Sequence, residues 1–221
     1  MRKILLLTCI LLAVAAALPA TASVWCGENG IIRFSFVEGD SLVSVWDSGP
    51  AEAGVTKVDL YAWLTDVESV QHEGEVLMAI GGYELNLKIT GAEAYILSQE
   101  FPAPGFNVGR KQGSIVYGLG SGLSVARGST QLVHWKLMFT GRPENVRFDL
   151  ESEGLQSCMK TEGCTGSGTH ALYVGATSTH LLDMLSGAGY EPAWLNPAGE
   201  VDQTPVVSAE TWRKVGVYGS R

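Results

Sequence analysis

Apolar and polar residues alternate one by one in short runs between residues 31 and 150, and this pattern limits the fold more than any other feature of the chain. A period of two places successive side chains on opposite faces of an extended strand. In the clearest run, which spans 83–90, Tyr, Leu, Leu and Ile alternate with Glu, Asn, Lys and Thr. The same pattern predicts strands at 32–36, 42–46, 55–64, 114–117, 131–139 and 146–150, with Trp135 and Phe148 in the core.

Glycine, proline, asparagine and aspartate separate these runs, as turn residues separate antiparallel strands. The 27 glycines and the charged fraction of 17% favour short strands and many turns over a helical bundle. We therefore predict an all-β fold, an antiparallel two-sheet sandwich of the immunoglobulin or jelly-roll kind, with a closed barrel as the alternative. Residues 38–41 are expected to form the turn of a hairpin.

The first 22 residues have the pattern of a cleavable secretory signal peptide. Met-Arg-Lys is followed by an apolar run from Ile4 to Leu18 and by small residues at Ala20 and Ala22. The apolar run has about 15 residues, fewer than the roughly 20 that cross a bilayer, so no membrane span is predicted after cleavage. We expect a secreted protein in the periplasm, in the medium or at the cell surface, with its mature chain starting at Ser23.

The character of the sequence changes after residue 150, which suggests a domain organisation in three parts. Residues 23–150 are predicted to form the sandwich, 151–205 a loop-rich extension that packs on it, and 206–221 a C-terminal tail. Within the extension, a brief helix is expected from Thr179 to Leu185, and an irregular path from 190 to 205. The tail is predicted as a short amphipathic helix or strand that docks Trp212.

Three cysteines follow the signal peptide. Cys158 and Cys164 are close enough in sequence to close a small loop, and in an oxidising compartment they are predicted to form a disulfide. Cys26 is then left over. It is a buried free thiol, a rival partner for either of the other two, or a link to another chain.

Charge and motif spacing exclude several functions. The formal net charge of −8 disfavours nucleic acid as a partner. No cofactor or metal is predicted, because ligands at a diagnostic spacing are absent from the sequence. The glycine-rich segment 118–122 lacks the spacing of a phosphate-binding loop and is predicted as a tight connection between strands.

Candidate catalytic and binding residues are few. His134 falls on the face opposite Trp135 and is predicted to face solvent. A secreted hydrolase acting on glycosides or esters would use the carboxylates of Glu73 and Glu75, or His170. Exposed aromatic rings can instead stack on sugars, and the three residues predicted to bind a ligand in this way are Trp46, Tyr61 and Trp63.

Three segments carry a resemblance to a known family. The runs 55–64, 81–90 and 131–139 resemble strands of the cohesin and carbohydrate-binding-module superfamily of secreted bacterial β-sandwiches, over about residues 55–150. The resemblance implies a noncatalytic binding or structural module of an extracellular or cell-surface assembly. Its partner would be an extracellular protein module or a polysaccharide. Self-association through Cys26 or the Trp212 tail would suit a structural subunit.

Overall fold

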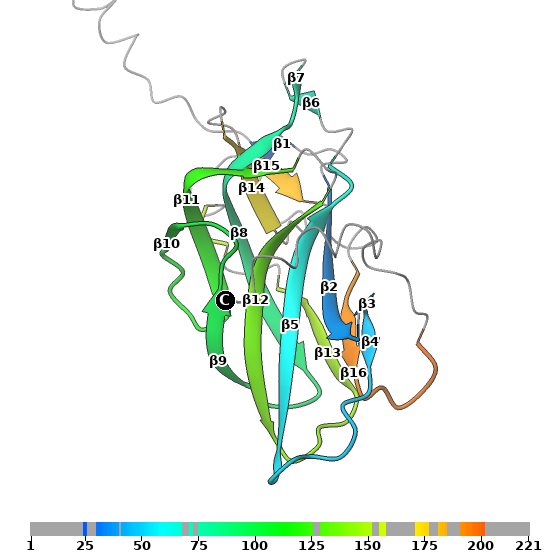
Figure 1. Ribbon diagram of the computed structural model, residues 1–221. Helices are drawn as coiled ribbons and strands as arrows, with labels where there is room; N and C mark the ends of the chain where they lie inside the picture. The colour runs from blue at the N-terminus through cyan, green and yellow to red at the C-terminus, as the bar shows by residue number, and fades with distance from the viewer. Residues whose placement is uncertain are drawn as a thin grey trace, which may run out of the picture.

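The computed structural model describes residues 24–25, 30–39, 41–67, 71–72, 75–125, 129–151, 155–157, 171–176, 181–184 and 191–201. These residues form two β-sheets that face each other in two layers (Figure 1). They include no helix, and so none that is long and apolar enough to span a membrane. The predicted all-β sandwich is confirmed.

The smaller sheet is a five-stranded antiparallel layer. Its strand order is β3 (Ser41–Val43), β2 (Ile31–Glu38), β5 (Val55–Thr65), β12 (Ser129–Thr140) and β9 (Tyr95–Glu100). The predicted hairpin is confirmed, because β2 pairs with β3 and its last pair joins Glu38 to Ser41. The turn residue Gly39 has a φ of 58°, a conformation that glycine adopts without strain.

The larger, nine-stranded sheet is organised around the long strand β8 (Ala79–Thr90). One edge of β8 pairs with β11 (Ser114–Ser124), which in turn pairs with β10 (Gly105–Asn107). On the opposite edge, β8 pairs with β14 (Ala171–Gly175) through its first half and with β13 (Val146–Leu150) through its second half. The sheet therefore forks beside β8.

Each branch of the fork continues through two short strands. β14 leads to β15 (Leu181–Met184) and then β1 (Val24–Trp25), whereas β13 leads to β16 (Ala193–Leu195) and then β4 (Val45–Trp46). The β1–β15 and β16–β4 pairs are parallel, and all other pairs of this sheet are antiparallel. A separate two-stranded ladder joins β6 (Gln71–His72) to β7 (Glu75–Val76).

The hydrophobic core fills the space between the two sheets. Trp135 of β12 and Phe148 of β13 are fully buried, as the alternation predicts. Phe148 packs edge-on against Phe36 of β2, with 5.6 Å between the ring centroids. The hydroxyl of Tyr83 on β8 donates to the carbonyl of Leu132 on β12, which links the two layers across the core.

The region after residue 150 departs from its prediction. Leu181–Met184 forms strand β15, so the helix expected from Thr179 to Leu185 is wrong. β14 and β16 also come from the segment predicted to be loop-rich, and both are paired within the larger sheet. The physical reason is the length of β8, since the backbone N–H and C=O groups of its first half lie beyond the end of β13. These groups require hydrogen-bond partners, and short segments with little alternation of apolar and polar residues supply them.

Three further strands, β11, β9 and β10, differ from what the sequence predicts. The glycine-rich segment 118–122 is not a connection between strands, because it lies within β11. The register between β11 and β8 shifts from Gly118 to Leu123, so the extra glycines are accommodated as an irregularity in one strand. Strands β9 and β10 were not predicted, because their apolar residues do not follow a long alternating run.

Several predictions fall outside the described residues. They concern the signal peptide at 1–22, Cys26, the Cys158–Cys164 disulfide, the tail with Trp212, and the candidate residues Glu73 and His170. Of Glu75 only the backbone is described, in β7.

Candidate binding pocket

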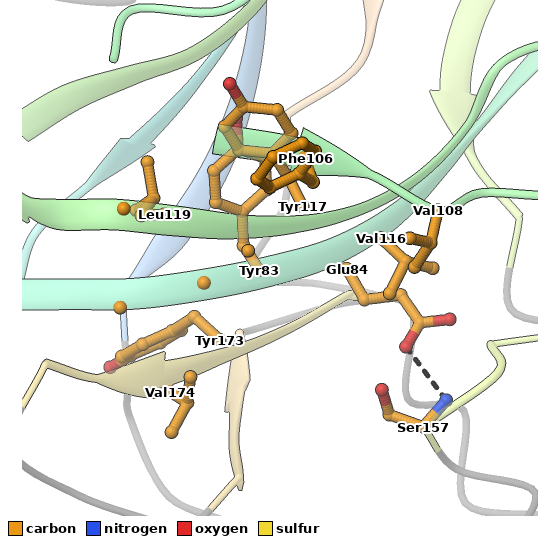
Figure 2. Close-up of a pocket in the computed structure, with 14 residues that line it drawn as sticks. Tyr83, Glu84, Phe106, Val108, Val116, Tyr117, Leu119, Ser157, Tyr173 and Val174 are labelled. Carbon is orange, nitrogen blue, oxygen red and sulfur yellow. Dashed lines mark hydrogen bonds between the residues drawn. The ribbon is translucent and has the colours of Figure 1, made fainter. Parts of the chain in front are cut away.

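A pocket of about 480 Å³ lies on the outer face of the larger sheet, over strands β14, β8, β11 and β10 (Figure 2). Strand alternation places it there. Tyr83 points into the core, so its neighbours Gly82 and Glu84 lie on the opposite, outer face. The lining residues are Gly81–Glu84, Phe106, Val108, Val116–Gly120, Ser157, Tyr173 and Val174.

The floor of the pocket is a row of four residues in register across the sheet. Val174 pairs with Gly82, Gly82 with Gly118, and Gly118 with Phe106. Three strand spacings separate the two ends of this row, a distance of about 14 Å. Because the two central residues have no side chains, the backbone is bare between Val174 on one side of β8 and Phe106 on the other (Figure 2).

The two floor glycines have different roles. A Cβ atom on Gly118 would meet no atom within 4 Å, so this residue opens directly into the pocket. A Cβ atom on Gly82 would lie 2.8 Å from the carbonyl oxygen of Tyr117 on the neighbouring strand. Gly82 therefore permits the close approach of β8 and β11, whereas Gly118 leaves space for a ligand.

Glu84 forms part of one wall although it is a carboxylate. Its side chain is only 2% exposed. One carboxylate oxygen accepts a hydrogen bond from the backbone N–H of Ser157 at 2.9 Å (Figure 2). The other accepts one from the backbone N–H of Gln156. Because both oxygens are engaged, Glu84 fixes segment 155–157 as a wall of the pocket.

The opposite rim exposes large apolar side chains. Phe106 is 82% exposed and Val108 64% exposed, and both come from β10 or the residue just after it. Val108 is held beside Val116 of β11, since its N–H donates to the Val116 carbonyl at 2.9 Å. Exposed apolar residues around a concave, apolar site are typical of a binding surface.

Sequence reasoning did not identify this pocket. Its only signals are the glycines at 81–82 and 118–122, because glycine inside a strand pattern marks a close backbone approach or a bare surface. The pocket also needs the register that places Gly82 beside Gly118 and Phe106, and that register is a property of the folded sheet.

The three aromatic residues predicted to bind a ligand all lie outside the pocket lining. Trp63 is 0% exposed and its indole N–H donates to the hydroxyl of Ser35 at 3.1 Å. The prediction of an exposed Trp63 ring is thus corrected, because Leu42 of the β2–β3 hairpin packs over it. Trp46 is half-buried against Phe36, and Tyr61 is half-buried; ligand binding by these two stays a prediction.

His134 is also placed differently from its prediction. It is 9% exposed rather than solvent-facing, and its ring stacks on Tyr61 with 4.2 Å between centroids. Nε2 lies 2.6 Å from Asp59 Oδ1, and Nδ1 lies 3.2 Å from Glu100 Oε2. With both ring nitrogens engaged, His134 ties β5, β12 and β9 together and has no nitrogen left for catalysis or for a metal.

Asp59, Glu100 and Lys136 form a network around His134, and both carboxylates of this network have lowered pKa values. The hydrogen bond from His134 lowers the pKa of Asp59 below its ordinary range. The pKa of Glu100 is lowered mainly by the hydrogen bond from Lys136, whose Nζ lies 2.7 Å from the carboxylate. Among the residues that the structure describes, no group of three His, Cys, Asp or Glu side chains is placed to hold a metal ion.

Comparisons with known proteins found similarity among solved structures. No protein-family model and no curated protein matches the sequence. Among solved structures, the chain is similar to the cohesin module of a family 33 glycoside hydrolase from Clostridium perfringens ATCC13124. The TM-score is 0.39 at 12% sequence identity, over 76% of this chain and 98% of the cohesin module.

Proposed function

We propose that the protein is a noncatalytic binding module that takes an apolar group of an extracellular partner into the pocket on the outer face of the larger sheet. The observation that carries this proposal is the bare glycine floor beside Phe106, a ring that is 82% exposed. Covering such a side chain removes apolar surface from water, and this contributes a favourable free energy of about 25 cal/mol for each Å² that is buried. The extracellular location follows from the signal sequence predicted at residues 1–22.

The chemistry of the lining favours a protein partner over a polysaccharide. Val108, Val116 and Val174 make the walls apolar, and the Glu84 carboxylate is already occupied by two backbone N–H groups. A sugar would leave hydroxyl groups without partners here, which costs free energy. A volume of about 480 Å³ readily accepts an aromatic or branched aliphatic side chain.

Filling the pocket from its floor tests this function. The substitution Gly118→Val points a side chain into open space, and valine suits a strand, so the fold should be retained. The probe is N-acetyl-phenylalanine amide, titrated against the isotopically labelled protein while the backbone resonances of Phe106 and Val116 are followed. We expect weak, saturable binding to the native protein and at least about tenfold weaker binding to the variant.

The matched control is Gly199→Val, because Gly199 also has open space around its missing Cβ but lies outside the pocket. It should bind the probe like the native protein. Unchanged binding by Gly118→Val, or no binding by the native protein, would refute the proposed site. Turnover of a chromogenic ester or glycoside by the purified protein would refute the noncatalytic assignment.

A further inference from the structure

Strand β10 forms one edge of the larger sheet, and half of its backbone faces away from that sheet. On its inner side the hydrogen bonds with β11 involve alternate residues: Val108 N–H donates to Val116, and the Pro104 carbonyl accepts from Gly120. The intervening residues Gly105 and Asn107 therefore direct their N–H and C=O groups outward. In the described part of the chain, no strand pairs with this outer edge.

A strand added at this edge would cover the exposed apolar side chains of β10 and of the residue just after it. Phe106 and Val108 are the most exposed large apolar residues in the described part of the chain, and both lie on the pocket side. In a neighbouring strand, every second side chain lies on the same face, about 5 Å from its partner across the pair. Alternate apolar residues of an added strand would thus cover Phe106 and Val108.

The turn that follows β10 adds positive charge beside this edge. Arg110 and Lys111 are exposed, and neither forms an ion pair with a described residue, in contrast to Arg33 and Arg142. The turn is held in place, because the Ser114 N–H donates to the Lys111 carbonyl at 3.0 Å. Two unpaired cations on a chain of net charge −8 attract acidic groups to this point.

We propose that the β10 edge docks an extended, acidic segment of a partner protein as an additional strand. Backbone hydrogen bonds to Gly105 and Asn107 hold the segment, its alternate apolar side chains cover Phe106 and Val108, and its acidic end pairs with Arg110 and Lys111. The inference rests on the proposed function, because it identifies the kind of partner whose apolar group the neighbouring pocket receives.

A synthetic peptide tests the charge element. The probe is acetyl-Asp-Asp-Val-Thr-Phe-Thr-Val-amide, compared with the same peptide carrying two lysines in place of the aspartates. We expect the lysine peptide to bind about tenfold more weakly to the native protein. The double variant Arg110→Glu and Lys111→Glu should reverse this preference. The control Lys57→Glu and Lys88→Glu changes the net charge equally at exposed positions outside the turn, and it should retain the native preference.

Two further measurements test the added strand itself. N-methylation removes backbone donors, so methylating alternate peptide residues should abolish binding in one register and spare it in the other. Amide hydrogen exchange at Gly105 and Asn107 should slow when the peptide binds. Exchange at Phe106 and Val108 should change little, because their N–H groups already face β11.

The outcome separates this inference from the proposed function. If N-acetyl-phenylalanine amide occupies the pocket but the peptide does not bind, the edge proposal is overturned and the pocket stands. Peptide binding that is insensitive to N-methylation in both registers, or to the charge reversal, also overturns the edge proposal. Failure of both probes overturns both.

Discussion

Removing the Glu84 carboxylate should destabilise the protein through the pocket wall that it holds. Glu84 is 2% exposed and accepts hydrogen bonds from two backbone N–H groups, those of Gln156 and Ser157. A hydrogen bond to a charged group contributes about 1.5–3 kcal/mol, so the pair contributes at most about 3–6 kcal/mol. In Glu84→Ala, the half-buried N–H groups regain contact with water. We therefore expect a loss near the lower limit, about 3 kcal/mol.

The measurement is urea unfolding followed by tryptophan fluorescence, together with a thermal melt. For a domain of this size, about 3 kcal/mol corresponds to a decrease in Tm of about 6–12 °C. Glu84→Gln retains one acceptor oxygen and should lose about half as much stability. Glu93→Gln makes the same change of charge at an exposed residue and should alter the stability by less than about 0.5 kcal/mol.

A loss below about 1 kcal/mol in Glu84→Ala would refute the reasoning, because it would mean that the carboxylate does not hold segment 155–157. The same variant has a functional consequence at temperatures where it stays folded. Release of Ser157 from the pocket wall should weaken binding of N-acetyl-phenylalanine amide, whereas Glu93→Gln should bind it normally.

Three further changes give contrasting outcomes. Gly82→Ala forces a Cβ atom to 2.8 Å from a backbone oxygen and should lower the free energy of unfolding in urea by about 1–3 kcal/mol. Gly118→Ala should leave it unchanged or raise it slightly. Equal effects of the two substitutions would contradict the different roles of the two glycines. The folded-state pKa values of Asp59 and Glu100 are lowered, so their contribution to stability is present above the unfolded value of about 4 and is lost as the pH falls through the folded values. The double variant Asp59→Asn and Glu100→Gln should show a shallower loss of stability in acid, and a profile parallel to that of the native protein would argue against this network. Trp63→Phe removes a fully buried indole and its hydrogen bond, and it should lower the free energy of unfolding by about 2–3 kcal/mol. A decrease below about 0.5 kcal/mol in a urea titration would show that this ring is not tightly packed.

The same alternation that predicts the strands also explains the error at Trp63. Alternation assigns Leu64 to one face of β5 and Trp63 to the other, and both assignments hold. It does not show whether the second face is covered. The β2–β3 hairpin brings Leu42 onto Trp63, and this contact joins residues that are 21 positions apart. The burial of His134 between Asp59 and Glu100 has the same origin, because each of the three belongs to a different strand.

The sequence by itself determined the strands with a clear alternating run between 31 and 150, but not β9 and β10, and it determined which of their residues face inward. A side-chain period of two is a local property, and the hydrophobic effect buries the apolar face that it creates. Only the tertiary structure decided the partners of β8. The short strands β14, β15 and β16 carry weak local patterns and form because the long edges of β8 and β13 require hydrogen-bonding partners. The pocket is likewise a tertiary feature, since it exists only where the register places Gly82 beside Gly118 and Gly118 beside Phe106. Register depends on contacts between distant segments, and for that reason no local pattern contains it.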